Sequence, residues 1–160
     1  MGIALDSSLE DGRRWLREHW REGVKCPVCT QMVKLYSRKL YSSMAAALIH
    51  LYRNFDHNKY VHKSELVKAK KLATTFGGGD FAKLAYWGLI KEQEPSPGED
   101  KRTSGWWIIT DKGVQFVERK VKVKSHVLIF NSRFFGFEGR DVSIDDCLGE
   151  KWSYSELMGR

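Results

Sequence analysis

The residues of this sequence best suited to chemistry are two cysteines separated by two residues, in the run Lys25-Cys-Pro-Val-Cys-Thr30. Two thiolates at this spacing in a tight turn can bind one tetrahedral metal ion, and the proline between them helps to shape such a turn. Further ligands could come from the histidines and the third cysteine of the chain: His50, His57, His62, His126 and Cys147. His57 and His62 are spaced as in known zinc sites. The sequence therefore predicts a metal site at Cys26 and Cys29, with His57 and His62 as candidate additional ligands.

The same turn resembles the knuckle half of a zinc ribbon, although Thr30 stands where a glycine is usual and no second Cys-x-x-Cys follows. Because 27 residues lie between Cys29 and His57, such a site would have to form by tertiary contact. Zinc is the cofactor that this reading implies. Two alternatives stay open, namely a structural turn with free thiols and a redox dithiol. The redox alternative is the weaker, since no βαβ pattern of the thioredoxin kind surrounds the turn.

Motifs of the common enzyme classes are not found elsewhere in the sequence. The run Phe76-Gly-Gly-Gly-Asp80 is rich in glycine but lacks the pattern of a phosphate-binding loop, and it follows no convincing strand. The acidic pair Asp145-Asp146 has no basic partner in a recognisable register. No serine elbow and no HExxH motif occurs. We therefore expect a binding protein rather than an enzyme.

The charge of the chain indicates what it could bind. The 160 residues include 27 Lys and Arg against 20 Asp and Glu, which gives a formal charge of +7. Residues 134–160 contain three basic and six acidic residues, so this end carries −3 and the first 133 residues carry +10. The basic residues cluster at 13–25, 34–39, 59–71 and 119–124. A basic body with an acidic end favours an anionic partner, of which nucleic acid is the commonest.

Composition predicts a folded protein that works inside the cell. Apolar residues make up 42% of the chain and aromatic residues 12%, which excludes global disorder. No apolar run approaches the roughly 18 residues that a membrane span needs. The first residues show no signal-peptide pattern, and three cysteines do not form a complete disulfide framework. We therefore expect no membrane association and a cytoplasmic location.

Periodicity and turn residues predict an α+β fold in three parts. Residues 1–40 form an amphipathic helix at 7–22, the cysteine turn and a strand at 32–40. Residues 41–119 hold a helix at 42–54, a short strand at 60–62, a short helix from 64, a glycine-rich turn at 74–79, a helix at 81–87, strands at 89–93 and 106–110, and a helix to 119. Residues 120–160 form an extension rich in short strands, at 126–130, 134–137 and 142–144, before a final helical turn at 154–158.

The middle part resembles a winged helix-turn-helix domain, on four pieces of sequence in a fixed order. These are Ser43-Met-Ala-Ala-Ala-Leu-Ile-His-Leu-Tyr52, Tyr60-Val-His-Lys-Ser-Glu-Leu66, Asp80-Phe-Ala-Lys-Leu-Ala-Tyr-Trp-Gly-Leu-Ile90 and Gly105-Trp-Trp-Ile-Ile-Thr-Asp-Lys-Gly-Val-Gln-Phe116. The third is similar to the recognition helix and Gly-Leu-Ile of MarR-like and PadR-like regulators. The fourth is similar to their second wing strand and the helix start that follows it. The resemblance covers residues 41–119, about half of the chain.

The resemblance implies a regulator of transcription, of the phage or prokaryotic kind, that binds double-stranded DNA and can form homodimers. The residues that it places at the DNA lie before and in the recognition helix and in the wing: Thr74, Thr75, Gly79, Lys83, Tyr86, Lys101 and Arg102. The predicted recognition helix offers only Lys83 as a base, and it lacks Arg, Asn and Gln for bidentate base contacts. The basic clusters therefore favour contacts with the phosphate backbone.

The alternative function is a winged-helix module that binds another protein, in transcription or host machinery, without reading DNA bases. Tyr86, Trp87, Trp106 and the acidic end of the chain are its candidate interface, because Tyr and Trp are enriched at protein interfaces. A third interpretation of Tyr86 and Trp87 is ordinary packing. DNA binding through several bases should weaken steeply with salt, which distinguishes the first two functions.

Overall fold

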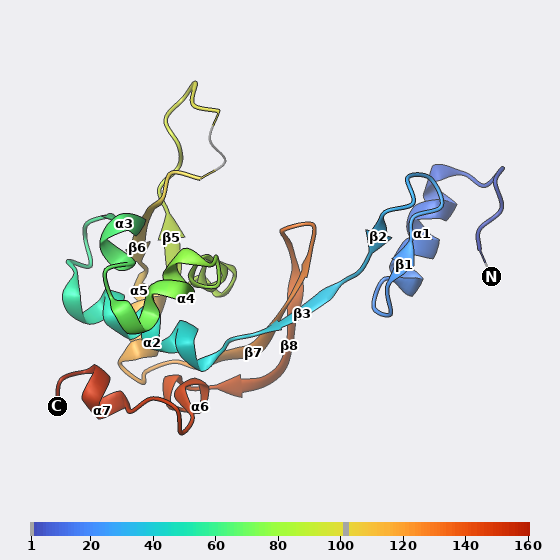
Figure 1. Cartoon of the computed structure of the whole chain (residues 1–160). Coiled ribbons are helices and arrows are strands. Elements are labelled where there is room, and N and C mark those ends of the chain that lie inside the picture. The colour runs from blue at the N-terminus through green and yellow to red at the C-terminus, as the bar shows by residue number, and fades with distance from the viewer. Residues whose placement is uncertain (1, 101–102) are drawn as a thin grey trace.

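The computed structural model describes residues 2–100 and 103–160, and it is α+β. Figure 1 shows a small N-terminal lobe, made by helix α1 (Leu9–His19) and strands β1 (Val24–Lys25) and β2 (Met32–Val33), standing apart from a larger body. Strand β3 (Tyr36–Lys39) runs from this lobe into the body. Residues 101 and 102, the expected wing contacts Lys101 and Arg102, lie outside the described residues.

The N-terminal lobe (residues 2–35) holds the predicted helix in a shorter form. Ser8 caps α1, since its hydroxyl accepts a hydrogen bond from the Asp11 backbone at 3.1 Å and the Asp11 carboxylate accepts from the Ser8 backbone. The single strand predicted over 32–40 is two strands. Leu35 lies between them; it is buried and donates its backbone N–H to the carbonyl of Trp20 at 2.9 Å.

Helix α2 (Ser42–Asn54) is the centre of the body, and its bounds are those that the sequence predicts. Met44, the three alanines and Leu48, Ile49 and Leu51 are all buried. The small alanines let neighbouring elements approach the helix on several sides, so it is surrounded rather than packed on one face. α2 is therefore the element on which the rest of the body is built.

A three-stranded sheet and several short helices follow α2. The sheet joins β4 (Val61–His62), β6 (Trp106–Ile109) and β5 (Ile90–Glu92) in the order β4-β6-β5, and both pairs are antiparallel. Between β4 and β5 lie α3 (Lys63–Leu66), the 3₁₀ helix η1 (Lys70–Leu72), α4 (Ala73–Gly77) and the 3₁₀ helix η2 (Phe81–Trp87); α5 (Asp111–Val117) follows β6. Residues 74–77 are helical rather than a turn, because Thr75 and Phe76 are buried there.

The C-terminal extension is more regular than its sequence predicts. Strands β7 (Val123–Phe130) and β8 (Arg133–Val142) form one long hairpin, with Asn131 and Ser132 at φ values of 50° and 59° in its tight turn. Two successive residues with positive φ are typical of hairpin turns whose twist matches the strands. β3 pairs with β7, so the first and last parts of the chain share the sheet β3-β7-β8.

Helices α6 (Ile144–Leu148) and α7 (Tyr154–Leu157) close the body against α2 and α5. Ile144 and Leu148 lie in the same buried cluster as Leu48, and the Tyr154 hydroxyl donates to the carbonyl of Val117 at 2.8 Å. The middle part and the C-terminal extension therefore share one hydrophobic core. Among the described residues, no helix combines the length and the apolar character that crossing a bilayer would take.

Candidate nucleic-acid interface and cysteine turn

The predicted recognition helix is η2, a 3₁₀ helix rather than an α-helix. Phe81, Leu84 and Trp87 point into the core, and the helix ends at Gly88, whose φ of 73° lies in the left-handed region that glycine adopts without strain. Because i and i+3 side chains of a 3₁₀ helix lie almost above one another, these three residues form one buried row. Only the opposite side of η2 is left for contact with a partner.

Lys83, the one base of η2, is held by its own helix. Its Nζ lies 2.6 Å from a carboxylate oxygen of Asp80, and about a third of its side chain is exposed. A lysine paired in this way carries little free charge towards a phosphate unless the pair opens. The ion pair therefore weakens the expected contribution of Lys83 to base or phosphate contact.

The C-terminal hairpin covers part of η2. The Tyr86 hydroxyl donates to the carbonyl of Ser132 at 2.8 Å, and the Trp87 indole N–H donates to the carbonyl of Lys124 at 2.7 Å. Trp87 is 1% exposed, so its expected role at a protein interface is wrong, and packing explains it. Trp106 remains 43% exposed on β6.

The other expected DNA contacts are partly brought together. Gly79, Lys83 and Tyr86 line one open hollow, which Glu92, Trp107 and Ser132 also line. Thr74 is exposed on α4, whereas Thr75 is buried and its side chain does not reach the surface. The hollow thus contains one paired lysine and the additional carboxylate of Glu92. The charges of this hollow therefore do not favour the binding of an anion such as a phosphate.

The segment 59–71, which we call the basic segment, precedes η2 in the chain and carries an excess of positive charge. It holds Lys59, Lys63, Lys68, Lys70 and Lys71 against one acid, Glu65. Lys68 pairs with Glu65 at 3.0 Å, and the Lys63 ammonium donates to the carbonyl of Gly77 at 3.2 Å. Lys59, Lys70 and Lys71 are exposed, and none of the ion pairs in the described part of the chain involves them.

The fourth basic cluster, at 119–124, is partly neutralised by the acidic end. Arg119 makes two hydrogen bonds of 2.8 Å to the Asp145 carboxylate, and Lys124 pairs with Asp141 at 3.2 Å. The guanidinium of Arg119 also lies 3.8 Å from the ring centre of Tyr154. The acidic end therefore binds within its own chain, and the net positive charge concentrates elsewhere on the body.

The cysteine turn lies in the N-terminal lobe, between the paired strands β1 and β2. The backbone N–H of Cys26 donates to the Gln31 carbonyl at 2.8 Å, and that of Thr30 donates to the Cys26 carbonyl at 2.9 Å. Thr30 has a φ of 64°, so it takes the left-handed conformation that favours glycine at this place. Hydrogen bonds from the backbone of Cys29 and Val28, and from the Cys29 thiol, lower the pKa of Cys26. The turn therefore stabilises a thiolate at Cys26.

Neither expected histidine reaches the cysteine turn. His57 Nε2 lies 2.6 Å from the carbonyl of Tyr52, and His62 Nδ1 lies 2.8 Å from the Ser64 hydroxyl, both in the body. Within residues 2–100 and 103–160, no group of three or more His, Cys, Asp or Glu side chains is placed to hold a metal ion. Cys26 and Cys29 are thus a pair of free thiols in one turn, and the described residues add no third metal-ligating side chain to them.

Cys147 differs from the other two thiols. It is half-buried on α6, and burial raises its pKa to about 12, with the neighbouring Asp146 adding to the effect. Because the thiolate is the reactive form, we expect iodoacetamide at pH 8, with chelator present, to modify Cys26 and Cys29 at least ~10-fold faster than Cys147. Mass spectrometry of timed samples measures the three rates. Equal rates would contradict the packing of α6.

No protein-family model, curated protein or solved structure matches this chain.

Proposed function

We propose that the chain is a winged-helix protein that binds double-stranded DNA mainly through its phosphate backbone, and that it regulates transcription in a prokaryote or phage. The order of elements supports a winged helix. Helix α2, strand β4, the short helices, the hairpin β5–β6 and helix α5 follow one another as in that fold, with the first strand paired to the third.

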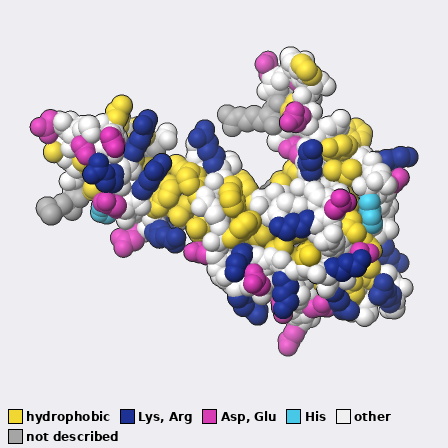
Figure 2. All heavy atoms as spheres, turned by 180° about the vertical axis from the view of Figure 1, so that it is seen from behind, with side chains coloured by type: hydrophobic (Ala, Val, Ile, Leu, Met, Phe, Trp, Pro, Cys, Tyr) yellow, Lys and Arg dark blue, Asp and Glu magenta, His cyan; other side chains and the backbone are white. Residues whose placement is uncertain are grey.

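The basic segment is the observation that carries this proposal. It spans β4, α3 and η1, which precede η2 and correspond to the part of a helix-turn-helix that crosses the DNA backbone. Figure 2 shows Lys and Arg side chains spread over the face of the body seen from behind Figure 1, with fewer Asp and Glu among them. Lysines contact phosphates as point charges and carry no sequence information.

The side chains of η2 are engaged in contacts within the chain, which supports a weak preference for DNA sequence. Lys83 is paired with Asp80, Tyr86 is bonded to the hairpin, and Trp87 is buried. The bidentate pairs that discriminate bases require Arg, Lys, Asn or Gln presented freely to the groove. A protein with free lysines beside such a helix should bind many duplex sequences with similar affinity.

Fluorescence anisotropy with labelled duplexes of unrelated sequence tests this. We expect binding at low salt with affinities within about tenfold of each other, and a linear fall of log K with log salt concentration. Changing Lys70→Glu and Lys71→Glu together should weaken binding at least ~10-fold and reduce the salt slope by about 2, because each lysine contacts about one phosphate.

The matched control is Lys122→Glu with Lys151→Glu, which changes the charge equally at two exposed sites outside the basic segment. It should leave affinity within about twofold. Equal weakening by both pairs would show that only net charge matters and would contradict the assigned surface. Failure of the unmodified chain to bind any duplex at low salt would overturn the DNA proposal.

A protein-binding function is the second candidate, and one observation favours it. Four aromatic side chains of the sheet β3-β7-β8 are at least 40% exposed: Tyr36, Phe134, Phe135 and Phe137. Figure 2 shows hydrophobic side chains on the segment that joins the N-terminal lobe to the body. Exposed aromatic clusters are typical of protein interfaces. A complex made through this surface should persist at salt concentrations that dissociate DNA.

A further inference from the structure

The N-terminal lobe leaves its apolar side chains uncovered. Helix α1 has apolar and charged residues on different faces, as in an amphipathic helix, yet none of its residues is buried. Leu5, Leu9 and Val28 are 101%, 75% and 83% exposed. A folded unit of fewer than about 40 residues usually needs a disulfide, a metal ion or association with another chain, because it cannot bury enough surface alone. The lobe is of this size, and its two cysteines, Cys26 and Cys29, are both free thiols.

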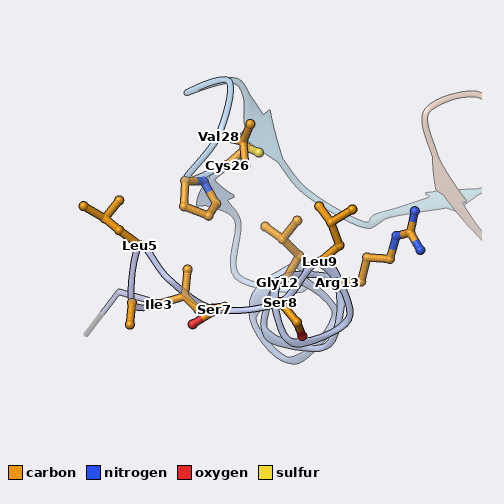
Figure 3. A pocket seen from close by; sticks show the side chains of 12 residues that line it. Ile3, Leu5, Ser7, Ser8, Leu9, Gly12, Arg13, Cys26 and Val28 are labelled. Carbon is orange, nitrogen blue, oxygen red and sulfur yellow. The ribbon is translucent and has the colours of Figure 1, made fainter.

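The uncovered side chains border a groove that also contains the cysteine turn. Figure 3 shows Ile3, Leu5 and Leu9 on one side of the groove, with Cys26 and Val28 across from them. Ile3 and Leu5 come from the segment before α1, Leu9 from α1, and Cys26 and Val28 from the turn after β1. The apolar surface and Cys26 therefore line one groove, and Cys29 follows three residues later in the same turn.

The number of ligands indicates what completes this site. A structural zinc ion takes four ligands in a tetrahedron, and the turn supplies two thiols. Every histidine and cysteine of the chain lies within the described residues, and none of them joins Cys26 and Cys29 in a metal-holding group. A four-coordinate zinc ion at this turn therefore needs two ligands from outside the described side chains. A second copy of the chain supplies two thiols in the same turn, already in the same conformation.

We infer that two copies of this protein share one zinc ion, bound by Cys26 and Cys29 of each copy, and cover each other's apolar grooves. A two-fold axis through the ion places the same surface of both copies in contact, as in most homodimers. Val28 follows the first ligand closely and would meet the apolar residues of the other lobe. This dimer does not depend on whether the body binds DNA.

The charges beside the turn suit such a centre. Zinc bound by four thiolates carries a net negative charge, which neighbouring cations stabilise. Lys25 directly precedes Cys26 and is exposed, and Arg13 borders the same groove. Two copies bring two of each to the ion. The surroundings therefore favour four thiolates at the ion over mixed thiolate and carboxylate ligands.

The test uses the full chain purified without chelator and loaded with zinc. Elemental analysis should give one zinc ion for two chains, and light scattering after size-exclusion chromatography should give the mass of two chains. Removing zinc with a strong chelator should yield the mass of one chain, and adding zinc back should restore the dimer. Cobalt(II) in place of zinc should give the absorption spectrum of a tetrahedral ion with four thiolate ligands.

Variants separate the two parts of the site. Cys26→Ser with Cys29→Ser should abolish both zinc binding and the dimer, whereas Cys147→Ser should change neither. Val28→Glu keeps all ligands but places a charge in the groove, and it should raise the dimer dissociation constant at least ~10-fold. Circular dichroism confirms that the body stays folded in each variant, because its core is separate from the lobe.

Three results would overturn the inference. One zinc ion per chain in a protein with the mass of one chain would show that the site is completed internally. A dimer of unchanged affinity in the double serine variant would show that zinc is not shared. A dimer that is held by a disulfide, contains no zinc and dissociates on reduction would assign the thiols to redox chemistry instead.

Discussion

Replacing Trp87 with alanine should lower the free energy of unfolding by about 3–5 kcal/mol, the range for large aromatic residues removed from a core. The indole is 1% exposed and its N–H donates to the carbonyl of Lys124. Alanine would leave a cavity between η2 and β7 and an unpaired carbonyl on the hairpin. Urea unfolding followed by circular dichroism measures the loss, and an unchanged m-value would show that the denatured state is the same.

Trp106→Ala is the matched control, because this tryptophan lies on β6 but is 43% exposed. Its ring makes an edge contact with His62 at 5.1 Å between ring centres, so the loss should be about 1 kcal/mol or less. Trp87→Phe should fall between the two, since it keeps most of the packing and loses the hydrogen bond. Similar losses for Trp87→Ala and Trp106→Ala would contradict the packing of η2 beneath the hairpin.

Sequence patterns predicted the elements that are defined by residues close together in the chain. The apolar spacing of Met44, Leu48 and Leu51 identified α2 with its bounds, and the polar loop between two apolar runs identified the pair β5 and β6. The ion pair between Asp80 and Lys83 joins the N-cap residue of η2 to a residue three positions later, so it too could have been anticipated from the sequence. These features depend on residues close together in the chain.

Contacts between distant residues were not predictable in the same way. Trp87 is buried by a strand that begins 36 residues later, and nothing in its neighbourhood distinguishes it from an exposed tryptophan. The hairpin β7–β8 was predicted as separate short strands at 126–130, 134–137 and 142–144, whereas β8 is continuous from Arg133 to Val142. Gly136 and Gly139 both have positive φ, and β8 continues through them.

The N-terminal helix shows the opposite error. Its stripe of Leu9, Leu16 and Trp20 is that of a helix packed on a core, and the sequence gives no sign that the body lies elsewhere. In the structure Trp20 packs on the body, with ring centres 5.6 Å from Phe130 and 5.1 Å from Phe135, and Arg21 pairs with Glu138 at 3.4 Å. A correct amphipathic pattern thus identified a face to be covered, but not what covers it.

The contacts of Thr110 and Gly113 explain why these residue types occur in the run Thr110-Asp-Lys-Gly113. The Thr110 hydroxyl donates to the Gly88 carbonyl at 2.5 Å and accepts from the Gly113 backbone at 3.0 Å, which caps α5 and joins it to the end of η2. A Cβ on Gly113 would meet the carbonyl oxygen of Leu89 and the side chain of Ile109 at less than contact distance. Glycine is required here by close backbone approach rather than by positive φ.

Gly113→Ala should therefore destabilise the protein by about 3 kcal/mol, the upper end of the range for overpacking, although alanine normally stabilises a helix relative to glycine by about 1 kcal/mol. Urea unfolding measures the change. The control is Gly77→Ala at the end of α4, where a Cβ would meet only Val67 at 4.0 Å, so stability should stay the same or rise slightly. The opposite sign of the two substitutions is the result that distinguishes close approach from helix propensity, and a gain in stability for Gly113→Ala would refute the contact between α5 and the chain after η2.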